Sequence, residues 1–267
     1  MPDAALATKH ALLVGRLREL GTVVVAFSGG ADSALLAHVA AATLGPRRAK
    51  AMTAASPSIA PEELADCAAL ASEWGLDWTA VPTAELDDPG YVVNDASRCA
   101  HCKTSLMDAL DGRVPGATVV LGVNVDDLGD HRPGQHAAAE RGAVFPLVDA
   151  GLSKADVRAL SRQLGLRTWD KPAAACLASR IPYGTPVTVE RLRSVASAET
   201  ALRALGFAAL RVRHYGDTAR LELPLEDLAA VLARREAVVS AVRGAGYRYV
   251  TLDLEGLRSG NLNQALG

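Results

Sequence analysis

Apolar positions in the first half of the chain follow two alternating periods. Leu12, Leu13 and Leu17 recur at helical spacing and predict a helix over residues 4–20. The valine run at residues 23–25 predicts a strand over 22–27, because β-branched side chains suit a strand that is buried on both faces. By the same criteria we expect strands at 50–54, 77–82 and 117–122 and helices at 32–44, 61–75, 101–110 and 153–165. Strands that alternate with helices predict an α/β fold with a doubly wound parallel sheet.

The pattern changes after about residue 170. Residues 170–186 contain Gly184 and three prolines and predict a loop. Beyond it we expect a helix, two strands joined by a turn at 215–217, a helix and a last strand, at 187–205, 208–214, 218–223, 225–244 and 247–254. This order predicts a smaller α+β domain, so we expect one domain over residues 1–170 and another over 171–267.

Composition narrows the class of protein. The 267 residues are 49% hydrophobic and 22% charged, which permits a packed core. The net charge of −2 argues against a large nucleic-acid footprint. The sequence has neither an apolar run long enough to span a membrane nor a signal-like start. We therefore expect a cytoplasmic protein, in which the four cysteines suggest metal binding or catalysis before disulfides.

A glycine-rich segment follows the first predicted strand. Ser28, Gly29 and Gly30 precede Asp32 and Ser33, which open the next predicted helix. A strand, a glycine turn and a helix N-terminus form a cradle for anions, since unpaired amides and the helix dipole point into the turn. The segment has no lysine and is not a Walker P-loop. The alternative is an ordinary tight turn between a strand and a helix.

A second polar cluster follows the strand predicted at 117–122. It contains Asn124, Asp126, Asp127, Asp130, His131 and Arg132. Because the carboxyl ends of parallel strands meet at one edge, it should lie near the glycine segment. Acidic side chains beside a triphosphate suggest Mg²⁺ between them, and an arginine fork suits phosphate oxygens. A solvated acidic turn is the alternative.

Three cysteines lie in polar surroundings. Cys99 and Cys102 are spaced as a pair that shares a metal or forms a redox couple. Cys176 lies in a proline-bounded loop with Lys171 and Arg180, which would favour a thiolate nucleophile. A small buried apolar residue is the alternative for Cys176. The fourth, Cys67, lies in the predicted 61–75 helix and is expected in the core.

Charged residues also mark the second half of the chain. Arg211 and Arg213 alternate along a predicted strand and should share a face. Two guanidinium groups on one face suit a phosphate or carboxylate, whereas a solvated strand face is the alternative. Glu199, Arg220 and Glu222 belong to the same cluster.

Together these motifs resemble one family. SGGADS resembles the PP-loop of ATP pyrophosphatases, which cleave ATP between the α and β phosphates. LGVNVDDLGDHRPG, KPAAACLASRIPYG, RVRHYGDTARLEL and VTLDLEGLRSGNLN narrow the resemblance to the LarE-type ATP-dependent sulfurtransferases of nickel-pincer nucleotide synthesis. The resemblance covers nearly the whole chain. It implies a PP-loop domain followed by a domain for sulfur transfer and substrate binding.

The resemblance also assigns roles to residues. Its substrate is a pyridinium biscarboxylic acid mononucleotide, whose carboxylate is activated as an acyl-adenylate. By resemblance Ser28, Gly29, Gly30, Asp32 and Ser33 hold ATP and Mg²⁺, and Asp127, Asp130 and Arg132 belong to that site, with Asp32 and Asp130 catalytic. Cys176 would attack the acyl-adenylate. Arg211 and Arg213 would clamp the substrate, with Ser179, Arg180, Glu199 and Glu222 lining the same region and the two glutamates as candidate metal ligands.

The resemblance implies one of two sources for the sulfur. In one, Cys176 is sacrificed and becomes dehydroalanine. In the other, Cys99, Cys102 and Cys176 hold a four-iron four-sulfur cluster, whose fourth iron carries the sulfide that is donated. Three cysteines in this arrangement favour the cluster. The resemblance also implies a homo-oligomer, a trimer or hexamer.

Three other functions share parts of the pattern. A PP-loop tRNA thiolation enzyme would need a basic face for RNA. An adenine-nucleotide sensor would bind ATP without releasing pyrophosphate and would need no nucleophile. An amidating synthetase would have no use for Cys176.

Overall fold

The computed structural model describes residues 4–129, 133–172 and 175–258. By its internal contacts the chain forms two compact units. The first unit comprises residues 1–85 and 99–174, and the second comprises 86–98 and 175–267. The chain passes from the first unit to the second between residues 174 and 175, close to the boundary predicted at 170/171. The 86–98 segment, which packs with the second unit, has no counterpart in the prediction.

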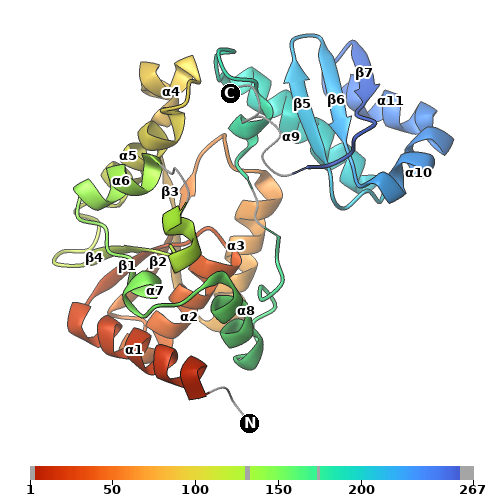
Figure 1. Ribbon diagram of the computed structural model, residues 1–267. Helices are drawn as coiled ribbons and strands as arrows, with labels where there is room; N and C mark the ends of the chain where they lie inside the picture. Colours follow the sequence, from red (N-terminus) through yellow and green to blue (C-terminus); the bar gives the residue numbers. More distant parts are fainter. Residues whose placement is uncertain (1–3, 130–132, 173–174, 259–267) are drawn as a thin grey trace. The chain divides into compact units, whose positions relative to one another are not determined.

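The first unit is built on a four-stranded parallel sheet with strand order β3-β2-β1-β4 (Figure 1). Its strands are β1 (Val23–Ala26), β2 (Ala49–Ala55), β3 (Asp77–Pro82) and β4 (Thr118–Leu121). Val23 pairs with Ala49 on one side and Thr118 on the other. The segments after β1 and after β4 therefore leave the same edge of the sheet from neighbouring strands.

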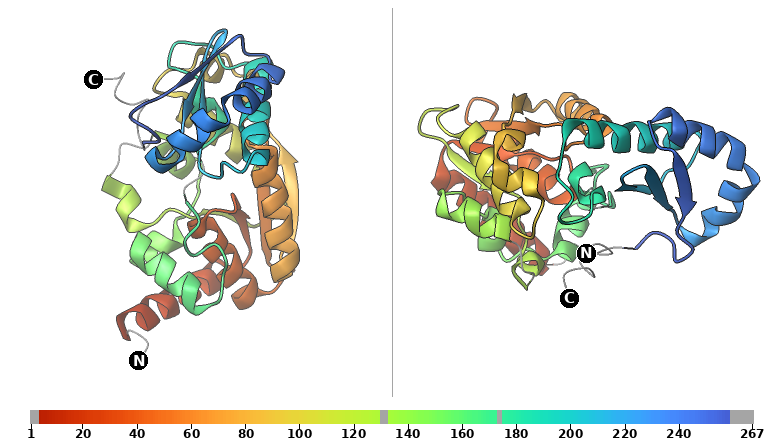
Figure 2. Two further views of the ribbon diagram at one scale, coloured as in Figure 1. Left: turned by 90° about the vertical axis from the view of Figure 1, so that its right-hand side faces the viewer. Right: turned by 90° about the horizontal axis from the view of Figure 1, so that it is seen from above.

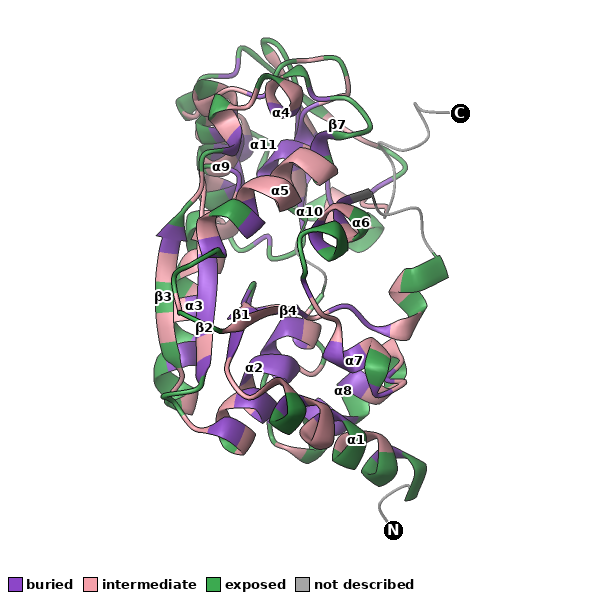
Figure 3. Ribbon diagram, turned by 90° about the vertical axis from the view of Figure 1, so that its left-hand side faces the viewer, coloured by how far each residue is buried: buried purple, intermediate pink, exposed green. Residues whose placement is uncertain are grey.

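Helices cover both faces of this sheet, as the valines of β1 require (Figure 2). Val23 and Val25 pack with residues of α1 (Ala4–Leu20), α2 (Ala31–Leu44), α3 (Pro61–Trp74) and α8 (Lys154–Gln163). Val24 points to the opposite face and packs with α5 (Arg98–Leu110). β1 is buried at its three valines (Figure 3). The prediction of an α/β fold with a doubly wound parallel sheet is confirmed.

Local sequence signals account for several element ends. Pro61 begins α3, and Gly75 caps its end in the left-handed conformation, as the proline and glycine positions indicate. The predicted strand at 77–82 is confirmed as β3. The first turn of α5 lies earlier than predicted, so that Cys99 is already helical. Helical segments that were not predicted are η1 (Glu85–Asp87), α4 (Pro89–Val93), η2 (Val125–Gly129), α6 (Pro133–Glu140), α7 (Pro146–Asp149) and, within the predicted loop at 170–186, η3 (Leu177–Arg180).

The second unit has a three-stranded mixed sheet with order β5-β6-β7. β5 (Arg211–Tyr215) and β6 (Thr218–Glu222) are antiparallel, and β7 (Tyr249–Leu252) runs parallel to β6. The β5–β6 hairpin turns at Gly216 and Asp217, where Gly216 takes φ +60°. Helices η3 (Leu177–Arg180) and α9 (Val189–Ala204) precede this sheet. The predicted small α+β region is confirmed.

The single helix predicted over 225–244 is wrong. The segment divides into η4 (Leu225–Asp227), α10 (Leu228–Ala233) and α11 (Arg235–Gly244). Arg234 interrupts the helix with φ −109° and ψ 21°. Val231 of α10 and Val238 of α11 both lie in the core of the second unit.

Asn94 ties the 86–98 segment into the second unit. It is buried, has φ +61°, and donates from Nδ2 to the carbonyls of Pro182 and Thr185, each at 2.8 Å. Arg98 donates to Asn94 Oδ1 at 2.5 Å and to the Ala178 carbonyl at 3.0 Å. These bonds hold η3 and the segment that directly follows it.

Across residues 4–129, 133–172 and 175–258, no helix has the length and apolar character needed to cross a membrane.

Candidate active site

The glycine segment forms a tight turn between β1 and α2. Ser28 is exposed, and its hydroxyl lies 3.0 Å from the Ser33 hydroxyl, which also accepts the Ser28 amide at 3.2 Å. Gly30 is the N-cap of α2, and within the described chain no side chain caps this helix end. The first-turn amides of α2 therefore face the turn, as an anion cradle requires.

Gly29 could not be replaced by a residue with a side chain without distortion. Its φ is +70°, and a Cβ atom there would lie 2.9 Å from Cys67 Sγ and 3.8 Å from Lys171 Nζ. Cys67 is buried, as predicted, and burial raises the pKa of its thiol despite a hydrogen bond with Thr53. The turn thus rests directly on α3.

Asp32 is held by two side chains from other segments. Asn124 Nδ2 donates to Oδ1 at 3.1 Å, and Lys154 Nζ donates to Oδ2 at 2.5 Å. Asp127 in turn holds Asn124, because Asp127 Oδ2 accepts a hydrogen bond from the backbone N–H of Asn124 at 3.1 Å. The structure therefore brings the two predicted polar clusters together at the carboxyl edge of the sheet. Asp130, His131 and Arg132 lie outside the described residues.

Gly122 and Lys154 belong to this site but were not predicted. A Cβ atom on Gly122 would lie 2.6 Å from the Ser33 amide nitrogen, so β4 ends directly against the first turn of α2. Lys154 follows Ser153, which begins a capping box with Asp156. The start of this helix at residue 153 was predicted, but no local signal indicated that Lys154 reaches Asp32.

A second unpredicted arrangement involves Lys171. Its ammonium lies 2.8 Å from Glu63 Oε2 and 2.7 Å from Asp66 Oδ2, both on α3. Burial opposes the charged form, but the two carboxylates outweigh it and raise the pKa of Lys171. The structure therefore pairs Lys171 with α3, whereas the sequence grouped it with Cys176.

The Cys99–Cys102 pair lies on the first turns of α5. Cys99 is exposed, Cys102 is half-buried, and both are free thiols. The start of α6 packs beside them, because a Cβ atom on Gly134 would lie 2.9 Å from the Cys99 carbonyl oxygen. Among the described residues, no three or more His, Cys, Asp or Glu side chains are grouped as a metal site. The cluster role of the cysteines remains a prediction.

Cys176 is exposed and precedes η3. This exposure excludes a small buried apolar role for its thiol. Arg180 holds the loop, since Nη1 donates to the Ala175 carbonyl at 2.8 Å and to the Ser179 hydroxyl at 3.0 Å. The Ser179 amide donates to the Cys176 carbonyl at 3.0 Å. The loop thus presents the thiol outward while its backbone is fixed by neighbours.

Two fully buried carboxylates organise the arginines of the second unit. Glu199 accepts Arg180 Nε at 2.8 Å, Arg203 Nη2 at 2.9 Å and the Val212 amide at 3.1 Å. Glu222 accepts Arg213 Nε and Arg220 Nη2, each at 3.0 Å. The structure gives both carboxylates arginine partners, and the metal role expected for them stays a prediction.

Arg211 and Arg213 differ in their surroundings. Arg213 is 2% exposed and also donates to the Ser179 carbonyl at 2.6 Å, so it is not part of a solvated strand face. Arg211 is half-buried and donates to the Arg258 carbonyl at 2.9 Å. Burial and the nearby Arg180 and Arg213 charges lower the pKa of Arg211. The buried carboxylates of Glu222 and Glu199 act in the opposite direction but do not outweigh these effects.

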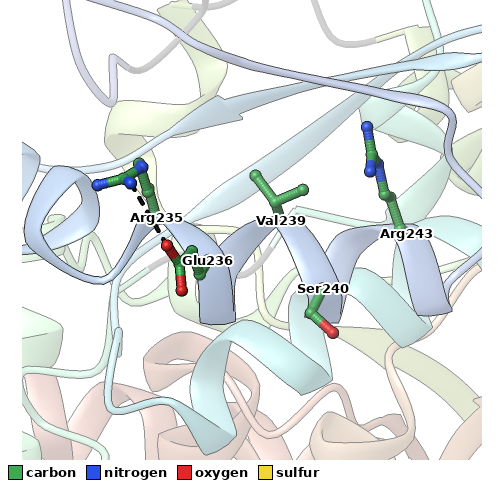
Figure 4. Close-up of a pocket in the computed structure, with 5 residues that line it drawn as sticks. All are labelled: Arg235, Glu236, Val239, Ser240 and Arg243. Atoms are coloured by element: carbon green, nitrogen blue, oxygen red, sulfur yellow. Dashed lines mark hydrogen bonds and ion pairs between the residues drawn. The ribbon is translucent and has the colours of Figure 1, made fainter.

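A hollow of about 450 Å³ lies elsewhere, along α11 (Figure 4). Arg235, Glu236, Val239, Ser240 and Arg243 line it. None of the predicted site residues contributes to it. In Figure 4 the Arg235 guanidinium is paired with the Glu236 carboxylate.

The fold, the glycine cradle and the similarity to known proteins together define the class of protein: an ATP-dependent enzyme with a PP-loop domain. Residues 12–100 match the family model described as NAD synthase. The chain is 46% identical to an uncharacterized protein of Synechocystis, over 93% of this chain and 94% of the relative. It is 25% identical to an uncharacterized protein of Methanocaldococcus jannaschii, over 89% and 91%.

One characterised relative narrows this class. The chain is 39% identical to the pyridinium-3,5-bisthiocarboxylic acid mononucleotide synthase of Lactiplantibacillus plantarum, over 98% of this chain and 96% of the relative. The chain therefore belongs to the LarE family of ATP-dependent sulfurtransferases. The family resemblance of the motifs is confirmed at this level.

Proposed function

We propose that this chain uses ATP to transfer sulfur to a carboxylate of a pyridinium biscarboxylic acid mononucleotide. The observation that carries the proposal is the exposed Cys176 thiol in a chain that matches the Lactiplantibacillus plantarum synthase over nearly its whole length. A carboxylate is a poor electrophile, so ATP is needed to convert it into an acyl-adenylate with release of pyrophosphate. The proposed sulfur donor then displaces AMP.

The first unit would bind ATP. Ser28, Gly29, Gly30 and Ser33 form the phosphate cradle, and Asp32 and Asp127 supply carboxylates that suit Mg²⁺. When bound, the Mg²⁺ would neutralise charge on the leaving pyrophosphate. We assign Asp130 and Arg132 to the same site from the family motif, with Asp32 and Asp130 as catalytic carboxylates.

The second unit would bind the pyridinium nucleotide through its arginines. Arg211 has a half-buried guanidinium that donates to the Arg258 carbonyl, and a guanidinium group suits a phosphate or carboxylate. Arg213 would support that site without contacting the substrate, because its guanidinium already donates to Glu222 and to the Ser179 carbonyl. Ser179, Arg180 and Glu199 would position the loop that carries Cys176.

The sulfur would come from a four-iron four-sulfur cluster held by Cys99, Cys102 and Cys176. Cys99 and Cys102 lie one turn apart at the start of a helix, and the Cys176 thiol is exposed, so all three are suited to binding iron. The alternative is that Cys176 itself attacks the acyl-adenylate and expels AMP. Cleavage of its Cβ–S bond with loss of the Cα proton would then leave dehydroalanine and a thiocarboxylate.

We extend the family resemblance to the assembly and partners of the chain. We propose a homo-oligomer, a trimer or hexamer, that acts on a small molecule and needs no nucleic acid. The near-neutral net charge of −2 supports the second point.

The experiment that tests this function measures ATP cleavage with and without the pyridinium biscarboxylate mononucleotide. We expect AMP and pyrophosphate to form together and only when that nucleotide is present. Cleavage that requires tRNA instead would indicate a thiolation enzyme of RNA. ATP binding with no AMP under any condition would indicate a nucleotide sensor, and either result would overturn the proposal.

A further inference from the structure

Lys154 is a cationic group at the proposed ATP site that no sequence motif assigned. Its Nζ lies 2.5 Å from Asp32 Oδ2, while the other carboxylate oxygen accepts Asn124 at 3.1 Å. Asp32 lies in the first turn of α2, directly after the glycine turn. The ammonium of Lys154 is therefore located at the mouth of the phosphate cradle.

The fold fixes the position of Lys154 through its backbone. Its amide donates to Asp126 Oδ2 at 2.8 Å, and the Val125 amide donates to the Leu152 carbonyl at 3.0 Å. Ser153 and Asp156 close a capping box on the same turn of α8. The start of α8 is thus joined to the segment that follows β4, and Lys154 is directed toward α2.

Asp32 places a negative charge in a site for phosphates. A carboxylate at a helix N-terminus is stabilised by the helix dipole but repels a polyphosphate anion. Lys154 offsets this charge, and its side chain is 34% exposed to solvent. An ammonium has three donors, and one is used by Asp32. The other two can meet a ligand that enters from solvent.

We propose that Lys154 binds the pyrophosphate portion of ATP and holds Asp32 when the site is empty. The inference rests on ATP use by the proposed function but not on the identity of the sulfur acceptor. It predicts a selective effect: ligands that carry a diphosphate should depend on Lys154, whereas AMP should not.

The test is isothermal titration calorimetry with ATP, inorganic pyrophosphate and AMP. Lys154→Met should weaken ATP and pyrophosphate at least about tenfold, since a charge-assisted hydrogen bond is lost, and AMP by less than about twofold. Lys154→Arg should keep most of the ATP affinity because it keeps the charge. Lys50→Met is the matched control, because Lys50 is also partly exposed and ion-paired, with Asp77 where β2 and β3 begin.

Equal affinity of Lys154→Met and wild-type protein for pyrophosphate would overturn the inference. So would equal weakening of all three ligands, which would indicate only a structural role. Failure of the wild-type protein to bind ATP would instead contradict the proposed function itself. Circular dichroism of each variant confirms that the compared proteins are folded. If Lys154→Met does not fold, Lys154→Gln replaces it in the same titrations.

Discussion

Gly122 and Ser33 lie in direct backbone contact. A Cβ atom on Gly122 would fall 2.6 Å from the Ser33 nitrogen and 2.9 Å from its Cα. The first turn of α2 and the end of β4 therefore need glycine at this position. Since the same turn of α2 forms the phosphate cradle, packing and ligand binding depend on one contact.

We expect Gly122→Ala to displace the first turn of α2. The added methyl group should lower the free energy of unfolding by about 1–3 kcal/mol, as overpacking does elsewhere, and should weaken ATP binding. Gly15→Ala is the control, because no heavy atom lies within 4 Å of a Cβ there and the residue is in α1. It should stabilise the protein by about 0.5–1 kcal/mol. The free energies of unfolding of both variants are measured in urea. Equal values for the two variants would contradict a tight contact between Gly122 and Ser33.

The Arg213–Glu222 pair should dominate the stability of the second unit. The two side chains are 3% and 0% exposed, with Nη2 and Oε2 2.9 Å apart. Glu222→Gln leaves a buried guanidinium without its counterion and should cost about 3–5 kcal/mol. The exposed Arg235–Glu236 pair provides the control, since Glu236→Gln should change stability by less than about 0.5 kcal/mol. Similar unfolding midpoints for the two variants would refute a structural role for Glu222.

Asp156 should make the stability of the first unit depend on acid pH. Burial tends to raise its pKa, but hydrogen bonds from Lys9 and Ser153 prevail and lower it to about 2. Because the pKa of Asp156 is lower in the folded state, its ionised carboxylate stabilises the protein at pH values above the unfolded-state pKa of 3.8. This contribution is lost as the pH falls toward 2. Asp156→Asn should therefore cost about 1–2 kcal/mol at neutral pH, after allowance for its partial exposure. The difference from wild type should shrink between pH 4 and 2; a constant difference would contradict it.

The source of sulfur can be determined from the protein itself. If a cluster supplies sulfide, anaerobically reconstituted protein should bind iron, and its intact mass after turnover should be unchanged. Cys99→Ala should then lose the iron–sulfur absorption band, whereas Cys67→Ala should keep it because Cys67 is buried in the core. Loss of the elements of hydrogen sulfide from Cys176, in protein that binds no iron, would establish sacrifice instead.

The sequence predicts best where local signals agree. Pro61, the acidic residues after it and Gly75 set the limits of α3, and alternation set β3. Contacts between distant segments were not predicted. Lys154 reaches Asp32 across more than one hundred residues, and nothing in the local pattern around Lys154 encodes that meeting.

The same limit applies to the second unit. Alternation predicted that Arg211 and Arg213 share a face of β5, but not that Glu199 and Glu222 would be buried with arginine partners. Helical periodicity over 225–244 could not reveal the break at Arg234, because the helix former arginine fits both a continuous and an interrupted helix. Residues 86–98 lacked any period and gave no sign of packing with the second unit.

The most direct test of the proposed function is the mass of the nucleotide product. Wild-type protein with ATP, Mg²⁺ and the pyridinium biscarboxylate mononucleotide should yield a product in which sulfur replaces a carboxylate oxygen, together with AMP. Cys176→Ala should bind ATP but yield no such product. A nucleotide that leaves the reaction with its carboxylates unchanged while AMP accumulates, or sulfur transfer by Cys176→Ala at the wild-type rate, would contradict the account.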